Sequence, residues 1–342
     1  MNNSLSKVSS WFGGLILIIT VFYIIFFDPT KFNPDYGSYE KLYNIIKNAD
    51  FRIYFNKFAF LDYFVRVFDF TGTYDGFRLI FASIEVLLFF IIIKNLKIGF
   101  KSLTFFISLT LSAFLLIKIH VQIREGFALL LWFLSLNSIQ KEKYISLKNL
   151  IFFLISSLLH TSTLIFWIST FILKYKNFSP KTKRRLIVIL FSLIGLSIWP
   201  FFANLIAIDY YDLINFESIN NMSSSKIFYW LSFLVIFILI FKSENSKITY
   251  INQKSIGNIN SSYIGNIGFY GFIGFVPIAG LAFLSGAVNA GTFNLIFRIV
   301  LNLLFLISFY RSSTQPKNFY TNILNSFLFI VVLRLLLFPN IN

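Results

Sequence analysis

The sequence contains no cysteine, and only 13% of its 342 residues are charged. The absence of cysteine excludes disulfides, thiol chemistry and metal sites with cysteine ligands. Soluble domains carry about 25% charged residues, so this chain has too little polar material to cover a surface that faces water. The shortage of charge therefore argues against an ordinary soluble globular domain.

Acidic residues are scarce as well, since 14 Asp and Glu stand against 30 Lys and Arg. In a soluble protein the resulting net charge of +16 would suggest a nucleic-acid partner. The sequence also lacks an HExxH motif, a Walker A motif and an acidic pair spaced for a metal. We therefore expect no metal, no nucleotide and no other cofactor.

The chain is rich in long hydrophobic segments. Hydrophobic residues make up 57% of the chain, and runs long enough to cross a bilayer as helices recur along it. Inside hydrocarbon, helices satisfy their backbone N–H and C=O groups internally. The sequence therefore predicts an all-α, polytopic membrane helix bundle of roughly 10–11 transmembrane or re-entrant helices. The predicted spans are residues 11–27, 76–93, 102–119, 123–139, 148–173, 186–204, 227–241, 263–284, 293–310 and 320–338.

The distribution of Lys and Arg orients these spans. With the N-terminus in the cytoplasm, the inner loops hold 18 basic and two acidic residues, and the outer loops hold 10 basic and 11 acidic residues. Basic residues gather on the cytoplasmic side of membrane proteins, so the charge indicates topology and not a nucleic-acid partner. We predict one integral-membrane domain over residues 1–342, with outer loops at 28–75 and 205–226 and a cytoplasmic loop at 242–262.

The apolar segment 148–173 has basic residues on both sides, including a dense cluster at 174–185. Both flanks can be cytoplasmic only if the segment enters the membrane and returns. Two helices of about 12 residues would each reach about 18 Å, with the turn at the polar stretch from His160 to Thr163. The alternative is a single tilted helix that leaves the basic cluster outside. We predict the hairpin.

Two stretches of the first outer loop have the pattern of amphipathic helices. Apolar residues recur at helical spacing at Tyr36, Tyr39, Tyr43 and Ile46, and a second apolar stripe crosses residues 56–70. We expect both helices to lie on the outer surface of the membrane.

Four ionisable residues lie in or near the outer half of the bundle by this topology: Asp35, Arg124, His160 and Arg298. Ionisable groups at membrane depth are costly, so each is a candidate functional residue. A guanidinium fork holds phosphate oxygens bidentately, and a carboxylate or an imidazole accepts a hydroxyl proton. The set therefore suits a lipid substrate that carries phosphate.

Each candidate also has a purely structural interpretation. Arg124 can pair with the neighbouring Glu125, and His160 can be a packing residue of an apolar segment. Asp35 stands at a predicted helix start, where a carboxylate caps the first turn. Arg298 can extend to the outer headgroups.

Three patches occur in order along the first half of the chain: Asp35-Tyr36-x-x-Tyr39-x-x-x-Tyr43, Arg124-Glu125-Gly126-Phe127-Ala128 and Leu159-His160-Thr161-Ser162-Thr163-Leu164. In order and spacing they resemble the EpsG-like and Wzy-type polymerases of bacterial O-antigen, capsule and exopolysaccharide synthesis. The second patch is similar to that family's R-Q-G-[IL]-A, with Glu125 in place of Gln, and the third to its F-H-x-S-A-L. The similarity covers about residues 15–175.

This resemblance implies a glycosyltransferase that joins oligosaccharide repeat units carried on undecaprenyl pyrophosphate at the periplasmic face of the bacterial inner membrane. The arginines would neutralise pyrophosphate, a carboxylate or imidazole would orient or deprotonate the acceptor hydroxyl, and tyrosines would stack on sugar rings. The implied partners are the lipid-linked glycan, membrane lipids and a chain-length regulator protein. The implied substrate-binding residues are Arg124, Arg298, Tyr36 and Tyr39, and the implied catalytic residues are Asp35 and His160.

Two other functions use similar residues. A flippase or transporter for the same lipid-linked glycan would have more spans and inverted repeats, neither of which the sequence displays. A multispan polysaccharide acyltransferase would also use a histidine and arginines. It would take its activated acyl donor from the cytoplasmic side, whereas the candidate residues face outward by the predicted topology.

The hairpin predicts the location of the basic cluster. A reporter fused at Lys181 should behave as cytoplasmic, because both flanks of 148–173 are rich in Lys and Arg. Paired fusions to a fluorescent protein and to alkaline phosphatase measure this, since each is active on only one side of the membrane. Phosphatase activity at this position would favour the single tilted helix.

Overall fold

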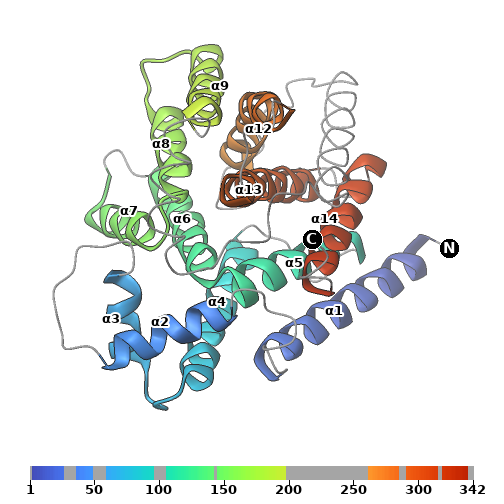
Figure 1. The fold of residues 1–342 in the computed structure, drawn as a ribbon. Coiled ribbons are helices and arrows are strands. Elements are labelled where there is room, and N and C mark those ends of the chain that lie inside the picture. The colour runs from blue at the N-terminus through green and yellow to red at the C-terminus, as the bar shows by residue number, and fades with distance from the viewer. Residues whose placement is uncertain are drawn as a thin grey trace. The chain divides into compact units, whose positions relative to one another are not determined.

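The computed structural model describes residues 2–26, 36–48, 59–95, 105–141, 145–197, 261–284, 290–314 and 318–337. All regular structure in these residues is helical, which confirms the predicted all-α class (Figure 1). The predicted span 227–241, the outer loop 205–226 and most of the loop 242–262 lie outside the described residues. The helices are α1 (Asn2–Phe26), α2 (Tyr36–Asn48), α3 (Ala59–Phe68), α4 (Tyr74–Asn95), α5 (Phe105–Phe114), η1 (Leu115–Val121), α6 (Ile123–Lys141), α7 (Leu147–Leu159), α8 (Thr163–Lys174), α9 (Pro180–Ser197), α12 (Ser261–Leu284), α13 (Ala290–Thr314) and α14 (Phe319–Leu337).

Among the described residues, four helices have the length and apolar composition needed to cross a membrane. These segments are Val8–Phe26, Tyr74–Asn95, Tyr263–Gly280 and Ile296–Thr314. Shorter apolar helices, including α7 and α8, accompany them. A polytopic membrane bundle with both long and short apolar helices therefore agrees with the predicted fold class.

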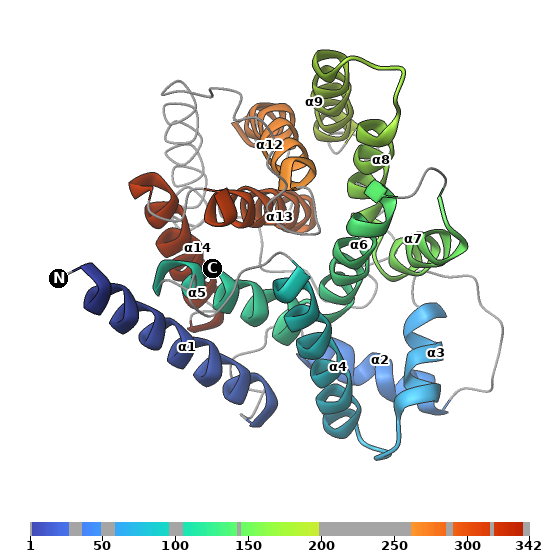
Figure 2. The same cartoon turned by 180° about the vertical axis from the view of Figure 1, so that it is seen from behind.

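The chain divides into two compact units. In the first, α1 to α7 and the start of α8 pack with α14, and α5 lies between α1 and α14 (Figure 2). The second contains the rest of α8 together with α9, α12 and α13. The assignment of both units to one integral-membrane domain stays a prediction.

The helices α2 and α3 confirm the two predicted amphipathic stretches, and the apolar stripe of α2 is buried within the protein. The buried residues of α2 are the four predicted ones, Tyr36, Tyr39, Tyr43 and Ile46. They join one hydrophobic cluster with Val65 of α3 and with residues of α4, α6 and α7. The apolar stripe of α2 therefore packs against other helices of the protein. That α2 and α3 lie on the outer surface of the membrane stays a prediction.

The segment 148–173 breaks into two helices at the predicted turn. Residues 160–162 separate α7 from α8, and the hydroxyl of Thr163 donates to the carbonyls of Ser156 and His160 at 3.0 and 2.8 Å. The indole Nε1 of Trp167 donates to Ser156 Oγ at 2.6 Å, which folds the start of α8 back onto α7. These contacts exclude one continuous helix. Whether both ends face the cytoplasm stays a prediction.

A seven-residue π-helix, η1, continues α5 and ends where α6 begins. Such widened turns are rare and are often found at functional sites. Gly126 in the first turns of α6 lies against this segment so closely that a Cβ atom would stand 2.0 Å from the carbonyl oxygen of Lys118. Only glycine lets the two backbones approach to this distance.

In the second unit, small residues bring three helices close together. Gly265, Gly268 and Gly271 of α12 stand at spacings of three, and Cβ atoms there would meet Tyr310, Ile307 and Leu303 of α13 at 2.8 to 3.0 Å. Gly274 faces the backbone of Val188 on α9. Close backbone approach of this kind stabilises helix packing where hydrocarbon supplies little hydrophobic driving force.

The contact at Gly126 generates a stability prediction. Gly126→Ala should destabilise the protein by about 1–3 kcal/mol or more, because the added methyl must displace the backbone of η1. Gly37→Ala is the matched control, since a Cβ atom at Gly37 of α2 would meet no atom within 4 Å. The thermal midpoint of each variant in detergent, followed by fluorescence-detected size-exclusion chromatography, measures the difference. Equal midpoints for the two variants would contradict the close approach.

Candidate functional site

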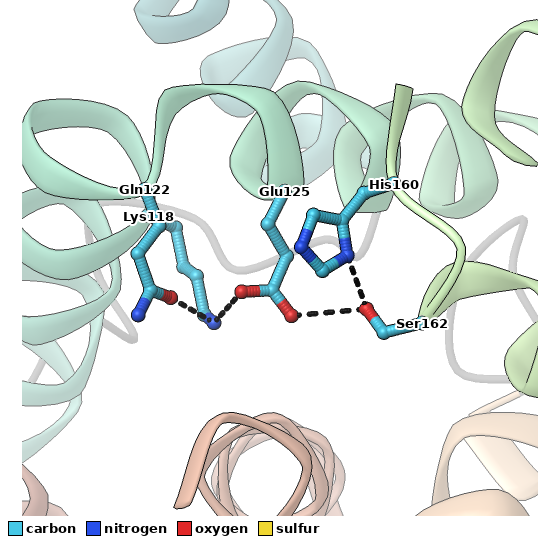
Figure 3. Close-up of polar contacts among 5 residues, drawn as sticks. All are labelled: Lys118, Gln122, Glu125, His160 and Ser162. Atoms are coloured by element: carbon cyan, nitrogen blue, oxygen red, sulfur yellow. Dashed lines mark hydrogen bonds and ion pairs between the residues drawn. The ribbon is translucent and has the colours of Figure 1, made fainter. Parts of the chain in front are cut away.

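A buried ion pair links η1 to the first turn of α6. Lys118 Nζ lies 2.9 Å from Glu125 Oε2, and both side chains are fully buried. Lys118 also donates to Gln122 Oε1 at 2.6 Å (Figure 3). Burying two charges is costly unless each is paired and hydrogen-bonded. The cation here meets both requirements.

The same carboxylate extends the polar contacts to the turn between α7 and α8. The hydroxyl of Ser162 donates to Glu125 Oε1 at 3.1 Å, and His160 Nδ1 lies 2.6 Å from Ser162 Oγ. We call these five residues, Gln122, Lys118, Glu125, Ser162 and His160, the polar chain. Figure 3 shows it running from η1 through α6 to the turn, where His160 is partly exposed.

The polar chain gives Glu125 a partner that the sequence pattern did not indicate. The sequence offers Arg124 as a neighbour for Glu125, and the structure adds an ion pair with Lys118. Lys118, Gln122 and Ser162 were not among the predicted site residues. A basic residue in the apolar run 102–119 was the available signal for Lys118.

Arg124 points to α2 instead. Its Nε lies 3.4 Å from the hydroxyl of Tyr39, and its guanidinium carbon lies 5.6 Å from the centre of that ring. The Arg124 side chain is nearly buried. The structure thus joins two of the predicted substrate-binding residues in one contact.

The tyrosines of α2 are buried, and two of them hold the start of α4: one bonds the first turn of α4, and the other bonds the loop before it. The hydroxyl of Tyr36 donates to Asp75 at 2.7 Å, and that of Tyr43 donates to Asp69 at 2.6 Å. Burial, and then the hydrogen bond to Asp75, raise the pKa of Tyr36 well above its ordinary value. Stacking on a sugar requires an exposed ring face, whereas the rings of Tyr36 and Tyr39 are buried here. Direct sugar binding by either stays a prediction.

A second buried polar contact lies in the same unit. Arg78 Nη1 of α4 is 3.4 Å from His120 Nδ1 of η1, and the ring of Tyr23 lies 5.4 Å from the His120 ring. Glu85, also on α4, is fully buried, and its carboxylate faces Gly126. Among the described residues it makes no hydrogen bond to another side chain.

Two predicted site residues, Asp35 and Arg298, remain. Asp35 lies outside the described residues, so its capping or catalytic role stays a prediction. Arg298 lies on α13 in the second unit and is partly buried. Its proposed contribution to the site of Arg124 likewise stays a prediction.

A comparison with protein families identifies the chain's family. The family model described as EpsG family matches residues 14–285, well over half of the chain. The matched range contains the whole polar chain and Arg124, whereas Arg298 lies beyond it. Searches of curated proteins and of solved structures found no match.

The buried pair generates a prediction about coupled substitutions. Lys118→Met or Glu125→Gln alone should destabilise the protein by about 3–5 kcal/mol, since each leaves a buried charge uncompensated. The double variant should recover most of this loss, because the amide of a glutamine at 125 can donate to Gln122 and its carbonyl can accept from Ser162. Thermal midpoints of the purified variants measure the coupling. A double variant whose loss equals the sum of the two single losses would contradict a direct pair.

Proposed function

Because the chain belongs to the EpsG family, whose members are polysaccharide polymerase-type membrane proteins, we propose that it is a glycosyltransferase that polymerises a bacterial surface polysaccharide. Its substrates are oligosaccharide repeat units of an O-antigen, capsule or exopolysaccharide, carried on undecaprenyl pyrophosphate. It acts at the periplasmic face of the inner membrane, with its own N-terminus in the cytoplasm. A chain-length regulator protein is a partner in this proposal.

The observation that carries the proposal is the placement of His160. The histidine stands at the turn between two short apolar helices and is partly exposed. Ser162 connects it to the buried carboxylate of Glu125. A positioned imidazole backed by a carboxylate is a common arrangement for a general base that works on a hydroxyl group.

In the proposed step the acceptor hydroxyl oxygen attacks the anomeric carbon of the growing chain. The bond between that carbon and the pyrophosphate oxygen breaks, and undecaprenyl pyrophosphate leaves with the electron pair. His160 takes the hydroxyl proton. No nucleotide-sugar is required, because the pyrophosphate is already a good leaving group.

Arg124 neutralises the leaving pyrophosphate in this proposal. Its Nε is directed at Tyr39, so a bidentate contact with phosphate oxygens uses the edge formed by the two Nη atoms. Arg124 lies within the residues that the family model matches and at the start of α6. Arg298 serves as a second cation for the anionic substrate, and Asp35 as a further group for the acceptor hydroxyl.

Loss of the gene should leave single repeat units on the lipid carrier and abolish long chains. Complementation with His160→Ala or Arg124→Ala should fail, and Arg124→Lys should rescue poorly because a point charge lacks the fork. Loss of one charged contact costs about 2–5 kcal/mol, or roughly 30- to 1000-fold or more in rate. Gel electrophoresis of the polysaccharide, with immunoblots of protein abundance, measures the effect.

Arg334→Ala is the control, since Arg334 lies four residues from the end of the predicted last span and is partly exposed. We expect this variant to make full-length polymer. Normal chain length with altered acetylation in the deletion strain would favour an acyltransferase, and loss of all outer-face repeat units would favour a flippase. Full-length polymer from Arg124→Ala at ordinary abundance would remove Arg124 from the site.

A further inference from the structure

The hydrogen bonds of the polar chain have a fixed direction. Lys118 carries only donors, so Glu125 Oε2 accepts from it, and the short pairing indicates an ionised carboxylate. An ionised carboxylate can only accept, so the contact at Oε1 requires the hydroxyl of Ser162 to donate. Ser162 has one proton, and this contact uses it.

The direction continues to His160. Because Ser162 Oγ has given its proton to Glu125, it can only accept from His160 Nδ1, 2.6 Å away. The opposite assignment would leave Ser162 Oγ and Glu125 Oε1 facing each other with lone pairs at 3.1 Å and no proton between them. Nδ1 of His160 therefore carries hydrogen, and in the neutral ring the lone pair is on Nε2.

His120 has the reverse arrangement. Its Nδ1 faces Arg78 Nη1 at 3.4 Å, and a guanidinium can only donate. Nδ1 of His120 is therefore an acceptor, and the ring proton is on Nε2. The two histidines of the chain thus have opposite tautomers. Arg78 sets that of His120 by direct contact, and Lys118 sets that of His160 through Glu125 and Ser162.

We infer that Glu125 and Ser162 are positioning residues that hold His160 in its Nδ1–H tautomer and so make Nε2 the atom that takes the acceptor proton. This inference rests on the proposed function of His160. When Nε2 takes the proton, the new positive charge is separated from the Glu125 carboxylate only by Ser162, which stabilises the imidazolium. Lys118 takes part indirectly, because it keeps Glu125 ionised.

Nuclear magnetic resonance of histidine labelled with ¹³C and ¹⁵N tests the tautomers directly, since the chain has only two histidines. In lipid nanodiscs at neutral or higher pH, wild-type protein should give one Nδ1–H and one Nε2–H ring. The spectrum of His120→Asn assigns the remaining ring to His160. Ser162→Ala should move His160 toward the Nε2–H form. Ser157→Ala is the control, because the hydroxyl of Ser157 on α7 makes no hydrogen bond among the described residues, and its spectrum should match the wild type.

Polymer assays on the same variants give an independent readout. Ser162→Ala should lower polymer formation roughly 10- to 100-fold at normal abundance. Ser162→Thr should restore most of it because it keeps the hydroxyl, and Ser157→Ala should behave as wild type. His160→Asn keeps a donor in the place of Nδ1 but has no Nε2, so it should insert normally and make no polymer.

The outcomes separate the two claims. An Nε2–H tautomer for His160 in the wild-type protein, or an unchanged His160 spectrum in Ser162→Ala, overturns the inference whatever the activity. The expected spectra combined with full polymer from His160→Asn would instead overturn the proposed role of His160 as the base and would leave the tautomer assignment standing. Loss of polymer by Ser162→Ala without rescue by Ser162→Thr would count against hydroxyl-dependent positioning.

Discussion

The buried ion pair between Lys118 and Glu125 is the interaction on which the candidate site depends. Each charge lies fully buried, so each is tolerated only while the other is present. Gln122 accepts a further hydrogen bond from the ammonium group of Lys118, and Ser162 donates one to the second carboxylate oxygen of Glu125. The pair and its hydrogen bonds thereby fix the positions of η1, the start of α6 and the turn after α7 relative to one another. Because His160 lies in that turn and contacts Ser162, the same contacts position its imidazole.

The backbone is shaped to bring the pair together. The π-helical turns of η1 lead directly into α6, and Gly126 lets the first turns of α6 lie against the carbonyl of Lys118. A side chain at 126 would push the two segments apart and lengthen the contact between Lys118 and Glu125. Glycine in this motif is therefore explained by close approach, and not by an unusual backbone angle.

Periodicity and polarity were enough to predict the helices, the buried face of α2 and the break at residues 160–162. They could not show what covers that face, because lipid and protein are equally apolar partners for Tyr43 and Ile46. They also could not pair Lys118 with Glu125. A regular helix does not bring residues seven apart into contact, and this contact needs the π-helix and the break at Gln122. The contact of Arg124 with Tyr39 joins residues far apart in the sequence, so local sequence patterns could not predict it either.

Lys118 explains why a glutamate stands at position 125, where the similar motif has glutamine. A glutamine at this position would still offer a carbonyl oxygen to Ser162, but its amide group would face the ammonium of Lys118, donor against donor. A carboxylate accepts from both neighbours at once, at 2.9 and 3.1 Å. Because both carboxylate oxygens accept, Ser162 must donate to Glu125 and accept from His160. The substitution and the buried lysine are therefore one feature, and its effect on the site is to leave the imidazole with a single defined basic atom.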